Sequence, residues 1–123
     1  MPENGTAPID EEVVAELLET TGGDRAFLGG LIETYLEDAP RHLSAMRNAA
    51  AAGDAGEVAR AAHALKGASG SMGATELSQQ ARAVEMAARD DDLSASEERI
   101  GTLEAEFERV ASALREVAAG PSD

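Results

Sequence analysis

The chain has 123 residues, which suits one domain with its own hydrophobic core. It contains no cysteine, so disulfides and thiolate metal sites are excluded, and its two histidines are too few for a three-histidine metal site. The formal net charge of −14 repels phosphate backbones and anionic lipid, which argues against binding to nucleic acid or to a membrane.

The composition also indicates the fold class. Aromatic residues are scarce, with two Phe, one Tyr and no Trp, which argues against a large β-sheet core. Ala, Leu, Glu and Arg dominate the periodic segments, and these residues are good helix formers, so we predict an all-α protein.

No apolar run approaches the roughly 20 residues of a membrane span. The first residues lack the basic and apolar blocks of a signal peptide, so we expect a cytoplasmic protein. Residues 1–8 are predicted to be a flexible lead-in, residues 9–119 one helical domain, and residues 120–123 a short tail.

Capping residues and apolar spacing predict five helices. The first covers residues 10–21, from a cap at Asp10 to a pair of glycines. The second covers residues 24–52 and starts at Asp24. It contains Pro40, which is expected to kink or interrupt the helix because proline lacks a backbone donor and clashes with the preceding turn.

The other three helices are predicted from similar start signals: Asp54 with Glu57 for residues 54–72, Thr75 for residues 75–90, and Ser94 with Glu97 for residues 94–119. The last of them has the clearest apolar stripe: Ile100, Leu103, Phe107, Val110, Leu114 and Val117. Such a stripe must bury against neighbouring helices, and the short connections favour antiparallel neighbours.

We therefore predict an antiparallel up-down-up-down four-helix bundle, formed by the second to fifth helices, with the short N-terminal helix across one end. We expect a monomer. The stripe of the last helix leaves open an alternative, a coiled-coil dimer formed by two copies of the chain.

The third predicted helix has one face with an unusual composition. At about 100° per residue, His63, Lys66, Gly67 and Gly70 fall together on a face directed to solvent. The opposite, buried stripe is predicted to contain Val58, Ala62, Leu65, Ser69 and Met72. Each glycine inside a helix costs roughly 1 kcal/mol relative to alanine, so two of them beside a histidine indicate that a partner approaches the backbone closely.

These residue types fit phosphoryl transfer. Neutral imidazole is a nucleophile near pH 7, and phosphoryl transfer needs positioning and charge neutralisation more than covalent machinery. Lys66, one turn from His63, is placed to neutralise a phosphoryl group. We find no nucleotide-binding loop, no metal site and no general base, which favours a phosphocarrier that is not itself an enzyme.

The segment from His63 to Gly73 resembles the HxLKG signature of histidine-containing phosphotransfer (Hpt) domains, and the resemblance extends from about residue 9 to residue 117. It implies a phosphorelay intermediate that carries a phosphoryl group between the aspartates of receiver domains, with a hybrid histidine kinase as a further partner. Mg²⁺ and the aspartate would come from the receiver. By the same resemblance, His63 is phosphorylated on its outer ring nitrogen, Lys66 interacts with the phosphoryl group, and Gly67 gives the receiver room.

Two positions of the fourth predicted helix also follow from the resemblance. Glu85 stands where some family members have a glutamine near the histidine, and an acidic side chain there is expected to face solvent rather than to stabilise the phosphate. Arg89, one turn later, stands where some members have a basic residue that contacts the receiver. Both positions are candidates for receiver contact.

Two interpretations remain beside the phosphorelay carrier. The chain could be a non-catalytic module that binds a receiver or another helix without carrying phosphate, or a structural homodimeric bundle. It has no kinase domain, so a stand-alone carrier is expected, with a piece of a larger kinase as the alternative. His42 is interpreted as a surface or packing residue.

Overall fold

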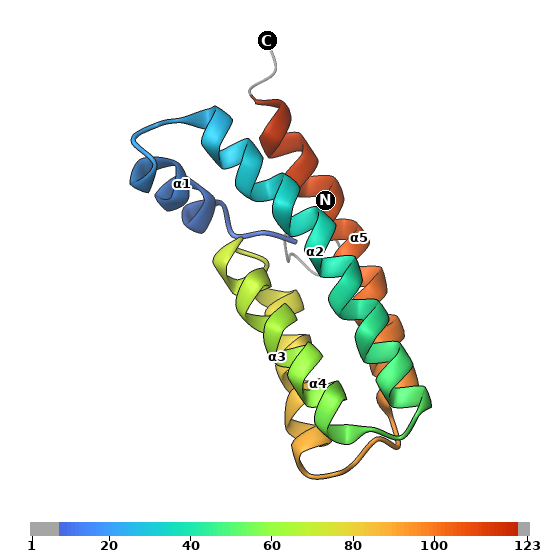
Figure 1. Ribbon diagram of the computed structural model, residues 1–123. Helices are drawn as coiled ribbons and strands as arrows, with labels where there is room; N and C mark the ends of the chain where they lie inside the picture. Colours follow the sequence, from blue (N-terminus) through green and yellow to red (C-terminus); the bar gives the residue numbers. More distant parts are fainter. Residues whose placement is uncertain (1–7, 121–123) are drawn as a thin grey trace, which may run out of the picture.

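The structure, a computed structural model, describes residues 8–120, and this part of the chain contains five helices and no strand. The helices are α1 (Glu11–Thr20), α2 (Arg25–Ala51), α3 (Ala55–Ser71), α4 (Thr75–Arg89) and α5 (Ser96–Ala119). Helices α2 to α5 run side by side as an antiparallel bundle, and α1 lies at one end of it (Figure 1). The predicted bundle with a short extra helix is confirmed.

Two predicted segments are not tested by this fold. The flexible lead-in over residues 1–8 and the tail over residues 120–123 lie almost entirely outside the described residues. Within residues 8–120, no helix is both long enough and apolar enough to cross a membrane.

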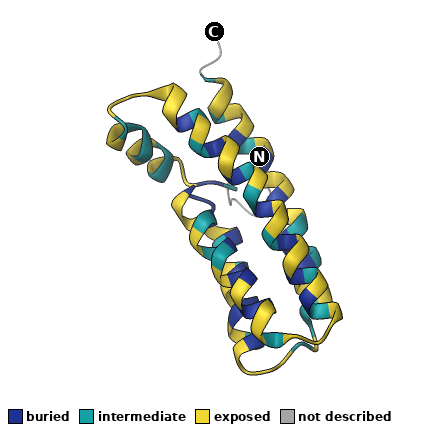
Figure 2. Ribbon diagram, viewed as in Figure 1, coloured by how far each residue is buried: buried dark blue, intermediate teal, exposed yellow. Residues whose placement is uncertain are grey.

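Each long helix packs on two neighbours, because α3 contacts α2 and α4 while α5 contacts the same two helices from the other side. The buried residues lie on the inward faces of the four helices (Figure 2). The predicted stripe of α5 is buried inside this chain from Ile100 to Leu114, and Val117 is half-buried against it. The bundle thus explains the stripe without a second copy of the chain.

The helix starts agree with the sequence in three cases and differ in two. Asp10, Asp24 and Asp54 cap α1, α2 and α3, and each carboxylate accepts a hydrogen bond from a backbone N–H of the first turn. The predicted caps of α4 and α5 are wrong, since both helices begin after an alanine whose side chain makes no cap. Ser94 is occupied elsewhere, because its hydroxyl donates to the Asp92 carboxylate at 2.6 Å in the preceding turn.

Pro40 does not interrupt α2, which continues as one helix from Arg25 to Ala51. Pro40 itself is exposed, and the backbone carbonyl that loses its i+4 partner is that of the half-buried Leu36. Of the two outcomes expected at Pro40, a kink or an interruption, the interruption is wrong.

The turn between α3 and α4 holds α1 against the bundle. The Asp10 N–H donates to the Gly73 carbonyl at 2.7 Å. Gly73 has a φ of +79°, and a Cβ there would lie 3.0 Å from the Asp10 oxygen and 3.2 Å from the Val13 Cβ. The left-handed backbone and the close approach of α1 both require glycine at this position.

We predict that Gly73→Ala lowers the free energy of unfolding by about 1–3 kcal/mol, because it adds left-handed strain and a clash with α1. Chemical denaturation measures this loss. The matched control is Gly67→Ala, where a Cβ would meet nothing within 4 Å. That variant should keep its stability or gain up to about 1 kcal/mol. Equal stability of the two variants would contradict the explanation.

Candidate functional site

The inner face of α3 fixes this helix in the bundle. The predicted stripe is buried in full: Val58, Ala62, Leu65, Ser69 and Met72. The Ser69 hydroxyl, 0 % exposed, lies 2.8 Å from the Tyr35 hydroxyl of α2 in a buried hydrogen bond. Burial raises the pKa of Tyr35 to about 12, so its hydroxyl stays protonated at neutral pH. The orientation of α3, and hence of its outer face, is set by these contacts.

The outer face of α3 presents His63, with a side chain that is 62 % exposed. Gly67 and Gly70 are also exposed on this face, and Lys66 is partly covered. A Cβ on Gly67 would meet nothing within 4 Å, and one on Gly70 would make only an ordinary contact with the Ser78 hydroxyl at 3.5 Å. Packing inside the chain therefore does not explain either glycine.

Glu85, on α4, joins the predicted site residues into one cluster. His63 Nδ1 lies 3.0 Å from Glu85 Oε2, and Lys66 Nζ lies 2.9 Å from Glu85 Oε1. Arg89 donates to Oε2 through both Nη2, at 2.6 Å, and Nε, at 3.0 Å. The Glu85 side chain is only 5 % exposed, so one buried carboxylate holds three side chains from two helices.

The charge state of this carboxylate determines the tautomer of the histidine. Burial acts to raise the pKa of Glu85. The hydrogen bonds from Arg89, Lys66 and His63, together with the charge of Lys66, outweigh the effect of burial and lower this pKa to about 2. An ionised carboxylate can only accept, so His63 Nδ1 must carry the hydrogen of their bond. The lone pair of a neutral His63 ring is then on Nε2, the nitrogen that does not face Glu85.

The family model described as Hpt domain matches residues 30–113. The chain belongs to the Hpt domain family. The crystal structure of histidine-containing phosphotransfer protein B (HptB) from Pseudomonas aeruginosa PAO1 is similar to it, with a TM-score of 0.87 and 27 % sequence identity over 96 % of this chain and 100 % of that chain. A comparison with curated proteins gives no match. The Hpt domain described here is thus a phosphocarrier, a histidine phosphotransfer intermediate of phosphorelay signalling.

The structure corrects one expectation about this Hpt domain. Glu85 was expected to face solvent, but it is among the most buried charged residues of the described chain. The reason is that Lys66, Arg89 and His63 supply enough donors to keep its charge stable away from water. The spacing of Glu85 and Arg89 by four residues could have indicated their ion pair. The family resemblance places position 85 near the histidine, but helical spacing does not indicate the contact of Glu85 with His63, since they lie 22 residues apart.

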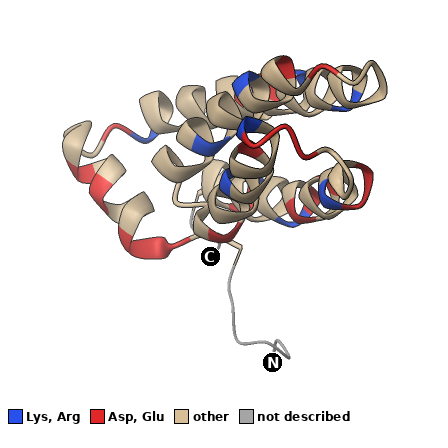
Figure 3. Cartoon of the chain, turned by 90° about the horizontal axis from the view of Figure 1, so that it is seen from below, with Lys and Arg blue, Asp and Glu red and all other residues tan. Residues whose placement is uncertain are grey.

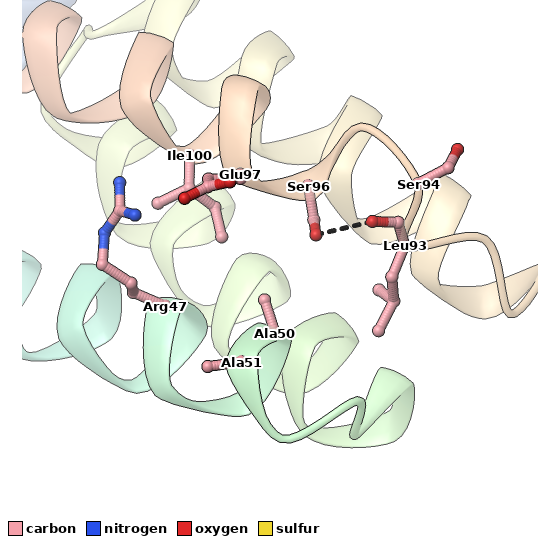
Figure 4. Close-up of a pocket in the computed structure, with 8 residues that line it drawn as sticks. All are labelled: Arg47, Ala50, Ala51, Leu93, Ser94, Ser96, Glu97 and Ile100. Carbon is pink, nitrogen blue, oxygen red and sulfur yellow. Dashed lines mark hydrogen bonds between the residues drawn. The ribbon is translucent and has the colours of Figure 1, made fainter.

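A pocket at one end of the bundle lies apart from this cluster. It has a volume of about 330 Å³ between the end of α2 and the start of α5, and Arg47, Leu93 and Glu97 are among its lining residues (Figure 4). None of the predicted site residues lines it. Arg47 is already paired with Glu104 of α5 through two hydrogen bonds of 3.0 and 2.8 Å. The candidate site of this Hpt domain is therefore an open helix face rather than a pocket.

Charge is distributed unevenly over the molecule. Figure 3 shows acidic residues along α1 and at turns between helices, with basic residues on the helices of the bundle. Two of the basic residues, Lys66 and Arg89, lie in the His63 cluster. Among residues 8–120, no group of three His, Asp or Glu side chains is placed to hold a metal ion.

We predict that Glu85 contributes to the pH dependence of stability. Its pKa is lower in the folded chain, about 2, than its ordinary value of 4.5, so its contribution is complete above about pH 5 and is lost as the pH falls toward 2. On the order of 2 kcal/mol of unfolding free energy should depend on it. Chemical denaturation at neutral pH and at about pH 3 measures how much unfolding free energy is lost on acidification. This loss should be smaller in Glu85→Gln than in wild type. Equal losses would contradict the prediction.

Proposed function

We propose that His63 accepts a phosphoryl group on Nε2 from the aspartyl phosphate of one receiver domain and passes it to the aspartate of another. The observation that carries the proposal is an exposed imidazole whose Nδ1 is held by a buried carboxylate, on a helix face with two glycines that packing does not need. The donors and acceptors are receiver domains, one of them in a hybrid histidine kinase, in the cytoplasm.

The chemical step needs no proton transfer. The lone pair of His63 Nε2 attacks the phosphorus, the P–O bond to the receiver aspartate breaks, and its electron pair returns to that carboxylate. The hydrogen on Nδ1 stays in place and its bond to Glu85 strengthens as the ring becomes positive. Mg²⁺ bound by the receiver would neutralise the phosphoryl oxygens. The Hpt domain supplies the nucleophile and its orientation.

The neighbouring residues serve the approach of the receiver. Gly67 and Gly70 keep the surface beside His63 bare, so a receiver loop can reach the imidazole. Arg89, with a side chain that is 57 % exposed beside the histidine, is the candidate for receiver contact. The Glu85 side chain has little exposed surface for such a contact, and it acts on His63 through the hydrogen bond to Nδ1.

Lys66 is the candidate for neutralising the phosphoryl group. Its ammonium is paired with Glu85 in the described state, one turn of α3 from His63, so it can turn toward a group on Nε2. We predict that Lys66→Ala slows transfer roughly tenfold and leaves the bundle folded, because Lys66 is outside the hydrophobic core; some stability is lost, because the buried Glu85 loses a partner. Stopped-flow or gel-based transfer assays and circular dichroism would measure the two properties. A wild-type transfer rate would remove the proposed role.

The proposal is tested by incubating the protein with phosphorylated receiver domains of its source organism. Label that is labile in acid, stable in alkali and mapped to the peptide containing His63 is the expected result. Acid-stable label, or label on another residue, would overturn the proposal.

A further inference from the structure

The cluster around His63 contains more than a nucleophile and a cation. One buried carboxylate, Glu85, has its two oxygens bound by Lys66 and Arg89, and the oxygen that Arg89 binds is also the one that holds the histidine. Before phosphorylation, both cations are thus committed to Glu85. A phosphoryl group on His63 would introduce a second anion beside the same two cations.

We propose that Glu85 raises the free energy of the phosphorylated form, so that this Hpt domain holds its phosphoryl group briefly and favours donation to an aspartate over storage. The inference rests on the proposed phosphorylation of His63, and it assigns to Glu85 the role of a positioning residue that sets phosphoryl-transfer potential.

The first reason is competition for positive charge. A phosphoryl group at neutral pH carries a charge between −1.5 and −2 in the phosphorylated side chains for which it is known. Lys66 and Arg89 together supply two positive charges, and Glu85 already takes one of them. If Lys66 turns to the phosphoryl group, Glu85 loses a partner, and burial makes that loss costly. An amide at position 85 would leave both cations to the phosphoryl group.

The second reason concerns the leaving group. With Nδ1–H held by Glu85, the phosphorylated ring is positively charged. When the phosphoryl group moves to an aspartate carboxylate, the P–N bond breaks and its electron pair returns to Nε2, which gives a neutral imidazole. A ring without the Nδ1 hydrogen would have to leave as an imidazolate anion, which is a much poorer leaving group. Glu85 therefore keeps the ring in the form that releases phosphate.

The third reason is direct repulsion. Glu85 lies at one nitrogen of the ring and the phosphoryl group would lie at the other, so two anions face each other across a single imidazole. Partial burial of the cluster weakens solvent screening of this repulsion. The competition for cations and the repulsion raise the free energy of the phosphorylated form, and the Nδ1 hydrogen speeds release of the phosphoryl group. Together they outweigh the stabilisation that comes from the stronger Nδ1–H bond to Glu85.

The test loads the wild-type protein and variants with phosphoramidate, a small phosphoryl donor that needs no receiver, at about pH 8, above the ordinary histidine pKa. Phosphorus NMR then follows the loss of phosphohistidine. We expect Glu85→Gln to lengthen the half-life roughly fivefold or more, and to shift the equilibrium with a receiver toward phosphohistidine by a similar factor.

Two further variants make the result specific. Arg89→Gln removes a cation and keeps Glu85, so it should shorten the half-life, the opposite of the effect of Glu85→Gln. Glu57→Gln is the matched control, because Glu57 is an exposed carboxylate on α3 that pairs with Arg60. It removes the same charge outside the cluster and should change the half-life less than twofold.

The outcomes separate this inference from the proposed function. If wild type and His63→Gln load equally, the assignment of His63 fails. If His63 alone loads, but Glu85→Gln leaves both half-life and equilibrium unchanged or shortens the half-life, only the inference about Glu85 is overturned. Should Glu85→Gln unfold, a lengthened or unchanged half-life in Arg89→Gln would overturn it.

Discussion

Replacing His63 by glutamine is expected to abolish acid-labile labelling by phosphorylated receivers, with a loss beyond about a thousandfold in transfer rate. Glutamine fills a similar volume and can still hydrogen-bond to Glu85, but its amide nitrogen is not a nucleophile at neutral pH. His63 is exposed on the outer face of α3, so the substitution removes no core contact and the bundle should keep its stability. Transfer assays and thermal unfolding measured on the same preparation would check both statements.

The second histidine provides the control. His42 lies half-buried on α2 and is not among the residues bound to Glu85. His42→Gln should be labelled as wild type is. The remaining interpretation is a module that only binds receivers. It predicts that His63→Gln keeps both its receiver binding, measured by titration, and its full biological activity. Such activity, or undiminished label on His63→Gln, would contradict the carrier.

Most of this fold could be predicted because the signals for its helices are local. Asp10, Asp24 and Asp54 stand directly before apolar periodic segments, and each caps the helix predicted from it. The starts of α4 and α5 could not be predicted in the same way. Thr75 is already the first residue of α4, whose first hydrogen bond runs from the Ser78 N–H to the Ala74 carbonyl, and Ser94 forms a turn with Asp92 instead. A polar residue near a helix start has several local partners, and spacing alone does not choose among them.

The candidate site was only half predictable for a related reason. The outer face of α3 follows from helical geometry, and so the grouping of His63 with Lys66, Gly67 and Gly70 could be predicted from sequence. The contact of His63 with Glu85 depends on how α3 and α4 pack against each other. A contact between two helices, unlike one within a helix, is not indicated by a regular spacing of residues in the sequence. A carboxylate was therefore expected at the surface, since buried carboxylates are rare unless several donors surround them.

Gly67→Gln is expected to slow transfer from a receiver at least tenfold while it stabilises the fold. Gly67 lies one turn beyond His63 on the exposed face, and the space around its Cα is open. A glutamine side chain would extend into the space that a receiver must enter, and a close approach to a small reactive centre tolerates little obstruction. Glutamine is a better helix former than glycine, so unfolding should need up to about 1 kcal/mol more free energy.

A receiver-free assay shows whether the obstruction is the cause. Phosphoramidate is small enough to reach His63 Nε2 past a side chain at position 67, so its labelling rate should stay within about twofold of wild type. Gly67→Ala, with a side chain of one carbon, should fall between wild type and Gly67→Gln in receiver transfer. Slowing with both donors would indicate damage to the His63 cluster itself. Unchanged receiver transfer in Gly67→Gln would show that the bare backbone beside His63 has a different purpose, because neither packing nor helix formation requires glycine there.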